Sequence, residues 1–361
     1  MSNIVYGGLD VHKDTIEVCL IDRSTGEIVS EQLPNDRTRL ERAVRRWSKL
    51  GELHLCYEAS GCGFVIKRWL DNVGVHCEVI APSLVPRAPG DRVKTDKRDA
   101  RKLATFYAGG LLQPVRVPDQ EEEGVRALVR LHDELTRDAT RAKNRALKYL
   151  ATLGYYYRDG KNWTKKHRAW LKALELTPVQ DLILRTHIEE LDNLVGQLEG
   201  VDRKIEEVAH TECYWGKVQR LMSLKGVGLY SAMVLLTEIG DARRFPDAPH
   251  LMGYFGLVPR EDSSGDSRRT GRITKAGSSR ARWVLTEAAW NQMSKPGNCD
   301  RLRKHWQGQP AEVVAIGKKA EKRLHDKFWK VALRKDRKTA ATAVAREMTG
   351  FIWALLTLEV A

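Results

Sequence analysis

The chain has 361 residues, and its 61 lysines and arginines outweigh 47 aspartates and glutamates to give a net charge of +14. This length favours more than one domain over a single minimal one. The charge favours a polyanionic partner, with nucleic acid as the leading interpretation and an ordinary basic enzyme as the alternative. We find no run of eighteen apolar residues and no signal-peptide pattern, so we expect a cytoplasmic protein without a membrane segment.

Strand-like and helix-like segments alternate over the first 110 residues. Three runs rich in β-branched residues predict a meander, and a helix follows the potential N-cap at Asn35-Asp36. The predicted strands are NIVYGGLDV (3–11), TIEVCLID (15–22), IVSEQL (28–33), ELHLCYEAS (52–60) and VHCEVIAP (75–82). Further helices are predicted in CGFVIKRWLDNVG (62–74) and in KTDKRDARKLATFYAGG (94–110). The order β-β-β-α-β-α-β-α predicts a layered α/β domain.

Four acids lie in three of these elements. Asp10 lies in the first strand, Glu58 lies at the end of the fourth, and Asp96 and Asp99 share one face of a helix at i and i+3. Carboxylates that meet at one edge of a sheet repel one another unless a cation lies between them. Such hard oxygen ligands suit Mg²⁺ or Mn²⁺, and a pair of these ions about 4 Å apart is used for in-line attack at phosphorus. The four acids therefore predict a metal site.

Each acid also has an ordinary structural interpretation. Glu58 could simply end a strand, Asp96 could be an N-cap, and Asp99 could be a first-turn acid favoured by the helix dipole. Asp10 favours the metal site, because its strand is otherwise apolar or rich in glycine. A carboxylate in such a strand is costly unless it has a partner.

A family resemblance rests on three of these motifs. GLDVHKD (8–14), CYEASG (56–61) and KTDKRDA (94–100), in this order and at this spacing, resemble the RuvC-like, RNase H-fold domain of the DEDD transposases of the IS110 and IS1111 insertion-sequence group. The resemblance implies that the four acids bind the metal. The basic neighbours Lys94, Lys97 and Arg98 then form a rim that would hold a phosphate backbone against the metal.

A long helix and a heptad-like segment occupy the middle of the chain. VRALVRLHDELTRDATRAKNRALKYLATLG (125–154) reads as a helix with a basic later half, in which Arg141 and Arg145 are candidate nucleic-acid contacts and a solvated face is the alternative. Apolar residues from Leu184 to Ala209 repeat at four-three spacing. This repeat predicts a coiled coil or helix pair and self-association, with an intramolecular hairpin as the alternative.

The last third of the chain joins a glycine turn to a basic tract. LKGVGLYSAMVLLTEIGDARRF (224–245) places Gly226 and Gly228 before an apolar helix whose N-terminal N–H groups suit a phosphate. LMGYFGLVPREDSSGDSRRTGRITKAGSSRARW (251–283) continues through a Pro-Gly-Ser loop into a basic patch of Arg268, Arg269, Arg272, Lys275, Arg280 and Arg282. The glycine turn, the GL-P step, the Ser-Gly loop and the G-ITK-G tract resemble the C-terminal transposase domain of the same family.

The resemblance also singles out one serine. In that family a loop serine is the proposed nucleophile, and the matching position is Ser264, directly before Gly265. A serine hydroxyl is a poor nucleophile until its proton is removed or its alkoxide is stabilised. A metal-carboxylate cluster from another domain or subunit could do this, while basic neighbours neutralise charge on the phosphorane. The adjacent Ser263 and Ser267 are chemical rivals.

The sequence as a whole predicts three parts. Residues 1–155 form a RuvC-like metal-binding domain with a trailing basic helix, residues 156–213 a helical or coiled-coil spacer, and residues 214–361 a mainly helical transposase domain with the serine loop. The resemblance implies insertion-sequence excision and integration by DNA strand exchange through a covalent serine-DNA intermediate. It further implies a structured guide RNA, DNA partners at the element ends and the target, a homo-oligomer (dimer or tetramer), and a bacterial or archaeal nucleoid-associated protein.

Two alternatives use the same residues differently. A RuvC-like nuclease or Holliday-junction resolvase would use the four acids and water without Ser264. A non-catalytic nucleic-acid-binding protein would use the acids only to cap helices and strands.

Overall fold

The chain divides into two compact units after Pro118. The structure, a computed structural model, describes residues 3–86, 95–264, 267–297 and 299–359, and leaves out the side chains of Ser83, Ser263, Ser264 and Arg268. The first unit spans Met1–Pro118 and the second spans Asp119–Ala361. The three-part organisation with boundaries after residues 155 and 213 stays a prediction.

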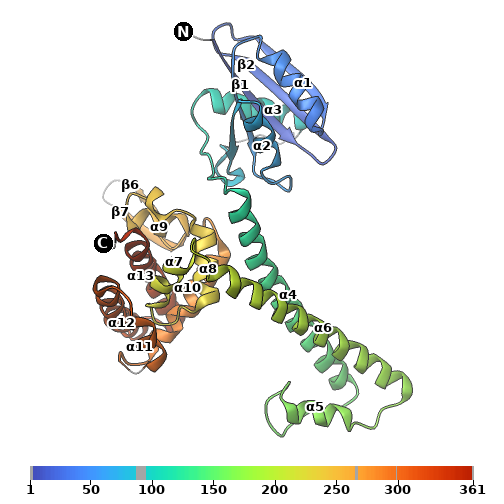
Figure 1. Cartoon of the computed structure of the whole chain (residues 1–361), viewed down its shortest axis with the longest axis vertical. Coiled ribbons are helices and arrows are strands. Elements are labelled where there is room, and N and C mark those ends of the chain that lie inside the picture. The colour runs from blue at the N-terminus through green and yellow to red at the C-terminus, as the bar shows by residue number, and fades with distance from the viewer. Residues whose placement is uncertain (1–2, 87–94, 265–266, 298, 360–361) are drawn as a thin grey trace. The chain divides into compact units, whose positions relative to one another are not determined.

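The first unit is built on a mixed five-stranded sheet with the strand order β3-β2-β1-β4-β5 (Figure 1). Strands β1, β2 and β3 form an antiparallel meander, and β4 and β5 continue the sheet in parallel from β1. The strands are β1 Ile4–Val11, β2 Thr15–Asp22, β3 Ile28–Pro34, β4 Glu52–Glu58 and β5 His76–Ile80. The helices are α1 Arg37–Trp47, α2 Val65–Asn72, the short 3-10 helix η1 Pro82–Leu84 and α3 Asp96–Ala108. The predicted order of strands and helices is confirmed.

Different helices cover the two faces of this sheet. Val5 and Leu9 of β1 belong to a core that includes buried residues of α1 and α2. Gly8 lies on the opposite face, because successive side chains of a strand alternate. A Cβ on Gly8 would come 2.2 Å from the carbonyl oxygen of Ala100 and 2.4 Å from the nitrogen of Ala104, both in α3. Glycine at this position therefore lets α3 lie directly against β1.

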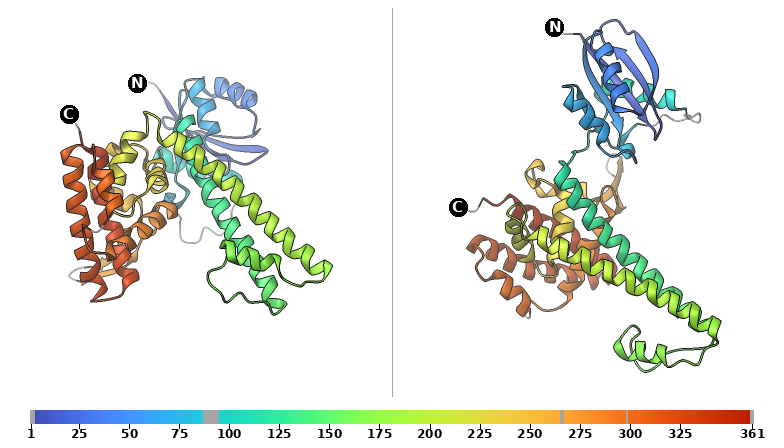
Figure 2. Two further views of the ribbon diagram at one scale, coloured as in Figure 1. Left: turned by 60° about the horizontal axis from the view of Figure 1, so that its bottom comes forward. Right: turned by 45° about the vertical axis from the view of Figure 1, so that its right-hand side comes forward.

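A pair of long antiparallel helices begins the second unit, as Figure 2 shows. These are α4 Gln120–Thr152 and α6 Pro178–Ala209, and the short α5 Lys165–Lys172 lies between them in the chain. Ala139 and Ala142 of α4 pack with Leu191 of α6, and Leu150 packs with Leu184. The four-three apolar repeat of α6 thus packs against α4 of the same chain, which agrees with the intramolecular hairpin that was the alternative interpretation of this pattern. Self-association stays a prediction.

The rest of the second unit is a helical body around one apolar core. Its helices are α7 Trp215–Met222, α8 Leu229–Ile239, α9 Ala248–Tyr254, α10 Ser279–Trp290, α11 Asp300–Trp306, α12 Ala311–Ala332 and α13 Arg337–Thr357, with 3-10 helices η2 Ala242–Arg244 and η3 Asn291–Met293. Every residue from Ala232 to Ile239 of α8 is buried, so α8 lies inside the body. The apolar α13 packs against α10 and α12.

Buried charges join α4 to this body. Glu238 of α8 accepts hydrogen bonds from Arg126 and Arg130 of α4 at 2.8 and 3.1 Å. Burial would raise the pKa of Glu238, but the two guanidinium groups outweigh it and hold the pKa below its ordinary value. Asp133 of α4 is paired in the same way with Arg280 of α10.

The predicted Pro-Gly-Ser loop is a β-hairpin. Strands β6 Pro259–Ser264 and β7 Ser267–Ile273 pair in antiparallel register, with a bulge or irregularity between Pro259 and Glu261. Asp262 pairs with Arg269, which places opposite charges across the two strands. The segment shows no alternation of apolar and polar residues, so periodicity alone could not predict these strands.

Candidate metal centre

The end of β1 and the beginning of α3 form the candidate site. Asp10 is the next-to-last residue of β1 and shares a face with Gly8, so it points to the side that α3 covers. Helix α3 has Thr95 as its N-cap, whose side chain accepts from the backbone N–H of Arg98. Asp96 is therefore the first helical residue and is not used as the cap. The close approach of α3 at Gly8 brings the first turn of α3 to Asp10.

Asp10, His12 and Asp96 form one cluster. His12 Nε2 lies 3.2 Å from Asp10 Oδ2 and 3.5 Å from Asp96 Oδ1. A possible metal site needs at least three His, Cys, Asp or Glu side chains whose ligand atoms lie close together. Among the residues that the structure describes, these three form such a group, with ligand atoms all within 4.8 Å of one another. The Asp10 side chain is 23% exposed, whereas those of His12 and Asp96 are 47% and 53% exposed. One possible ligand is thus fixed within the sheet, and two lie at the solvent side.

The electrostatics of the cluster favour a cation. Burial raises the pKa of Asp10, and the negative charges of Asp96 and Asp99 raise it further, while His12 acts in the opposite direction. A carboxylate under these conditions is stabilised by a positive charge between it and its neighbours. The oxygen ligands fit Mg²⁺ or Mn²⁺, and the residues present therefore fit the metal that the sequence predicts.

Glu58 and Asp99 lie next to this cluster in the fold. Strands β1 and β4 run parallel with Leu9 opposite Tyr57, so Asp10 and Glu58 follow one residue later on adjacent strands. Both lie on the α3 face, where Cys56, two residues before Glu58, packs with Leu103. Asp99 lies in the first turn of α3. Asp10 and Glu58 therefore lie at the same end of two neighbouring central strands, and Asp96 and Asp99 share the first turn of the helix that reaches Asp10.

His12 is a residue of the candidate site that the sequence motifs did not single out. It lies inside the GLDVHKD motif, one residue after β1 ends. A lone histidine beside a strand end has many ordinary interpretations. What distinguishes it is its distance from Asp96, which is set by the packing of α3 and cannot be inferred from the motif alone.

Comparison with known proteins connects this site to a family. Residues 7–154 match a family model described as a transposase, and residues 218–307 match the model of the IS116/IS110/IS902 transposase family. The transposase for insertion sequence element IS1533 of Leptospira borgpetersenii is 33% identical over 345 residues, which cover 91% of this chain and 96% of the relative. The y4qE protein of Sinorhizobium fredii is 34% identical over 318 residues, which cover 88% of this chain and 78% of the relative.

The chain belongs to the IS110/IS1111 family of transposases. A more distant relative, the pilin gene-inverting protein of Moraxella bovis, is 24% identical over 270 residues, with 73% of this chain and 74% of the relative covered. The transposase is an enzyme that acts on DNA, which excludes the non-catalytic alternative. Its first unit is the RNase H-like DEDD domain, and this domain implies the use of a divalent metal.

The structure describes two of the three residues of the predicted basic rim of the metal site. Lys97 and Arg98 are exposed in the first turn of α3, and Lys94 lies outside the described residues. Lysine and arginine at this place suit the phosphates of the transposase's DNA. Their contact with nucleic acid stays a prediction.

The candidate nucleophile of the transposase lies in the second unit. Ser264 is the last residue of β6 and pairs with Ser267 across the end of the hairpin, while Ser263 pairs with Arg268. The side chain of Ser264 is outside the described part of the structure. Arg269 and Arg272 are exposed residues of β7, and Lys275 follows that strand.

Several other predicted nucleic-acid contacts of the transposase have protein partners. Arg141 pairs with Asp138 at 2.8 Å, and Arg145 pairs with Glu190 of α6. Gly226 has a φ of +87°, and a Cβ there would come 2.6 Å from the carbonyl oxygen of Ala288, so packing against α10 already requires this glycine. Gly228 is the N-cap of α8.

Two arginines of the predicted basic patch have structural contacts. Arg280 binds Asp133, and Arg282 donates to the carbonyl oxygens of Phe255, Ala276 and Gly277. These contacts hold helix α10 against α4 and against the end of α9. In the described part of the transposase, no helix has the length and apolar character needed to cross a bilayer.

Proposed function

We propose that this transposase excises and integrates an insertion sequence by DNA strand exchange, with Ser264 as the nucleophile and Asp10, Glu58, Asp96 and Asp99 as the metal-binding acids. The observation that carries this proposal is the meeting of Asp10 and Asp96, with His12 between them, at the end of β1. The family membership supports the reaction class, and the raised pKa of Asp10 supports a cation at this place.

Asp10 and Asp96 would hold the metal, with Glu58 and Asp99 at its sides. When bound, a divalent cation stabilises charge on the reacting phosphate and on the attacking oxygen. Asp10 supplies a ligand fixed by the sheet, so its position does not depend on a mobile loop. His12, within hydrogen-bond distance of Asp10, keeps that carboxylate oriented or serves as a ligand itself.

Ser264 would carry the covalent step. Its hydroxyl oxygen attacks a phosphorus atom of the DNA backbone, and the bond from phosphorus to a deoxyribose oxygen breaks. The serine loses one proton and the leaving deoxyribose oxygen gains one to become a hydroxyl, so the step is balanced. The DNA is then joined to the serine by a phosphodiester, and the hydroxyl of a second strand reverses the reaction with a new partner. Arg269, which pairs with Asp262 near the end of the hairpin that carries Ser264, would neutralise charge on the phosphorane.

The acids and Ser264 belong to different units, so the reaction requires the two units to meet at one phosphate. This requirement is satisfied either within one chain or between subunits, and it is the reason we propose a homo-oligomer with composite active sites. The net charge of +14 supports a further polyanionic partner, and we include a structured guide RNA in the proposal.

A water-using nuclease is the second candidate function. The same acids would hold a metal that could activate a water in place of the serine hydroxyl. In that case hydrolysis would leave no bond between protein and DNA, and Ser264 would be dispensable.

An adduct assay separates these two functions. The transposase is incubated with Mg²⁺, labelled duplex DNA of the element end and RNA transcribed from the flanking DNA, and is then denatured. A labelled protein band that is lost in Ser264→Ala and in Asp10→Asn, but kept in Ser263→Ala, supports the serine mechanism. Metal-dependent cleavage that is unchanged in Ser264→Ala would reject it in favour of the nuclease.

A further inference from the structure

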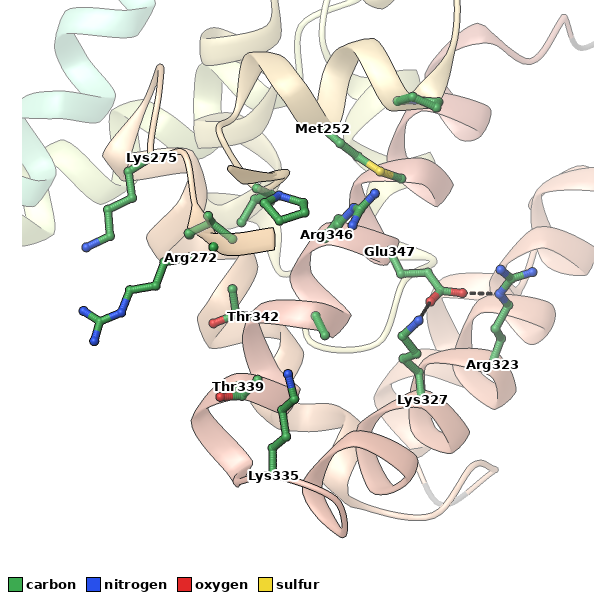
Figure 3. Close-up of a pocket in the computed structure, with 16 residues that line it drawn as sticks. Met252, Arg272, Lys275, Arg323, Lys327, Lys335, Thr339, Thr342, Arg346 and Glu347 are labelled. Carbon is green, nitrogen blue, oxygen red and sulfur yellow. Dashed lines mark hydrogen bonds and ion pairs between the residues drawn. The ribbon is translucent and has the colours of Figure 1, made fainter. Parts of the chain in front are cut away.

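A pocket of about 890 Å³ lies in the second unit between the β6–β7 hairpin, α9, α12 and α13 (Figure 3). Its apolar part includes Met252, Leu257 and Ile273. Of the described residues that line it, six are basic and one, Glu347, is acidic. An apolar surface beside a basic wall is the combination that a nucleotide needs for its base and its phosphate.

The single acid leaves most of this positive charge without compensation. Glu347 is paired with Arg323 and lies 3.3 Å from Lys327, so two cations already share it. Figure 3 shows this trio on the side of the pocket opposite Arg272 and Lys275.

Four cations remain around the pocket, namely Arg272, Lys275, Lys335 and Arg346. Within the described residues, none of the four forms an ion pair with an acid. Like charges that surround one volume repel one another until an anion enters it. The charge of the pocket therefore calls for a ligand that carries more than one negative charge.

The cations come from two parts of the chain. Arg272 and Lys275 lie within residues 218–307, which match the transposase family model, whereas Lys335 and Arg346 lie beyond that match. The pocket is thus completed by α13 and the turn before it, to which neither family model extends.

The pocket also has a defined place relative to the candidate nucleophile. Pro259 and Ile273, which line the pocket, pair at the base of the hairpin, and Ser264 lies five residues from Pro259 at its other end. At about 3.3 Å per residue, the backbone of Ser264 is roughly 17 Å from the pocket along the strand. A nucleic-acid strand held in the pocket would therefore lie within a few nucleotides of the serine.

We propose that this pocket binds an unpaired segment of a nucleic-acid strand, with a base on the apolar surface and the flanking phosphates on the four cations. A concave apolar surface accepts the face of a base only when the base has left its stack, which favours a single strand over a duplex. The hydroxyls of Thr339 and Thr342 donate to Asp336 and to the carbonyl of Lys338, and their free lone pairs can accept from the ligand. The inference rests on the proposed function only for the choice of nucleic acid as ligand.

Binding of short homopolymers to the full chain tests this proposal. The probes are fluorescent oligouridylate and oligothymidylate of twelve nucleotides and a blunt duplex of the same length. Their affinities are measured by fluorescence anisotropy over a range of salt concentrations. The pocket variant Lys335→Gln/Arg346→Gln is compared with Lys319→Gln/Lys330→Gln, which removes the same charge from exposed positions of α12 outside the pocket. Thermal melting verifies that both variants fold.

We expect the pocket variant to lose about tenfold in affinity for at least one single strand, and its log–log salt slope to fall by about 1.4, or about 0.7 for each lost phosphate contact. The control variant should bind nearly as the unchanged protein does. The strand that loses more affinity, RNA or DNA, identifies the source of the ligand. Equal losses in the two variants, or a loss seen only with the duplex, would overturn the proposal.

Photocrosslinking supplies an independent readout. Strands that carry 4-thiouridine or 4-thiothymidine are irradiated with the full protein, and the crosslinked peptides are mapped by mass spectrometry. We expect crosslinks in residues 249–259 or 271–275, and their loss in the pocket variant. Crosslinks found only elsewhere would contradict the proposal. A Ser264 adduct that still forms under these outcomes would leave the proposed function intact.

Discussion

Gly8 of β1 lies so close to Ala100 of α3 that a Cβ on Gly8 would stand 2.2 Å from the carbonyl oxygen of Ala100. This contact sets the distance between the sheet and the helix that carries Asp96 and Asp99. Asp10 lies two residues after Gly8 on the same face of the strand. The metal site therefore depends on a glycine that itself offers no ligand.

Gly8→Ala should separate the two halves of the metal site. Because backbone atoms cannot give way locally, α3 must shift, at a cost of about 1–3 kcal/mol in the free energy of unfolding. We expect a lower Tm and a loss of the Tm increase produced by Mn²⁺, measured by calorimetry. Gly61→Ala is the control, since a Cβ there meets nothing within 4 Å. A Gly8→Ala protein with an unchanged Mn²⁺ response would contradict the dependence on this contact.

Asp10→Asn should stabilise the metal-free protein and abolish its response to metal. The pKa of Asp10 is raised above its ordinary value of 3.8, so the folded state holds the proton more tightly than the unfolded state. The free energy of unfolding of the unchanged protein therefore falls as the pH rises from the ordinary pKa of 3.8 to the raised pKa of the folded state, and it stays at the lower level above that. Asparagine is uncharged, so it does not carry the cost of a charged carboxylate at this partly buried position beside other acids.

The test uses denaturant titrations of both proteins. In a chelator, the excess in free energy of unfolding of Asp10→Asn over the unchanged protein should be larger at pH 7 than at pH 3.5. With Mn²⁺ in place of the chelator, only the unchanged protein should be stabilised, by about 2.7 kcal/mol at a hundred times its Kd. Asp14→Asn, an exposed acid of the same loop region, is the matched control. Equal Mn²⁺ stabilisation of the Asp10→Asn protein would show that the metal binds elsewhere.

Replacement of His12 should weaken metal binding without removing it. His12 contacts both central acids, and loss of a ligand or of a residue that orients one typically costs about 10–100-fold in metal affinity. His12→Ala is compared with His54→Ala, because His54 also lies 3.2 Å from a carboxylate, that of Glu52, away from the site. Calorimetric titration with Mn²⁺ measures both. Equal affinities in the two variants would give His12 no part in the site.

The main effect of Arg280→Gln should be a lower free energy of unfolding, and not weaker DNA binding. Asp133, which is 5% exposed, accepts from Arg280 and Tyr230, and a buried acid that loses its cation costs about 3–5 kcal/mol. Urea titration should show this loss, and Asp133→Asn/Arg280→Gln should recover part of it. Arg269→Gln, on the exposed hairpin, should change stability by less than about 0.5 kcal/mol. Unchanged stability with weaker DNA binding would place Arg280 in a nucleic-acid interface.

The fold of the first unit could be predicted because its elements have strong local patterns. β-Branched runs gave the strands, Asp36 caps α1 as the sequence suggests, and an acid within the glycine-rich β1 pointed to the metal site. Each of these signals lies within one element or at its end.

What could not be predicted depends on contacts between distant residues. Arg280 was assigned to a basic patch because its partner Asp133 lies 147 residues away in the sequence. The hairpin that carries Ser264 is polar on both faces, so it has no periodicity to detect. His12 became part of the site only through the position of α3, which Gly8 determines.

We expect a divalent metal to bind where Asp10 meets Asp96. Crystals of the protein grown with Mn²⁺ and measured at the manganese absorption edge test it most directly, because anomalous scattering locates the ion without assumptions about its ligands. We expect a peak within coordination distance of the Asp10 and Asp96 carboxylates that is lost in Asp10→Asn. A manganese peak bound only by other residues would contradict it.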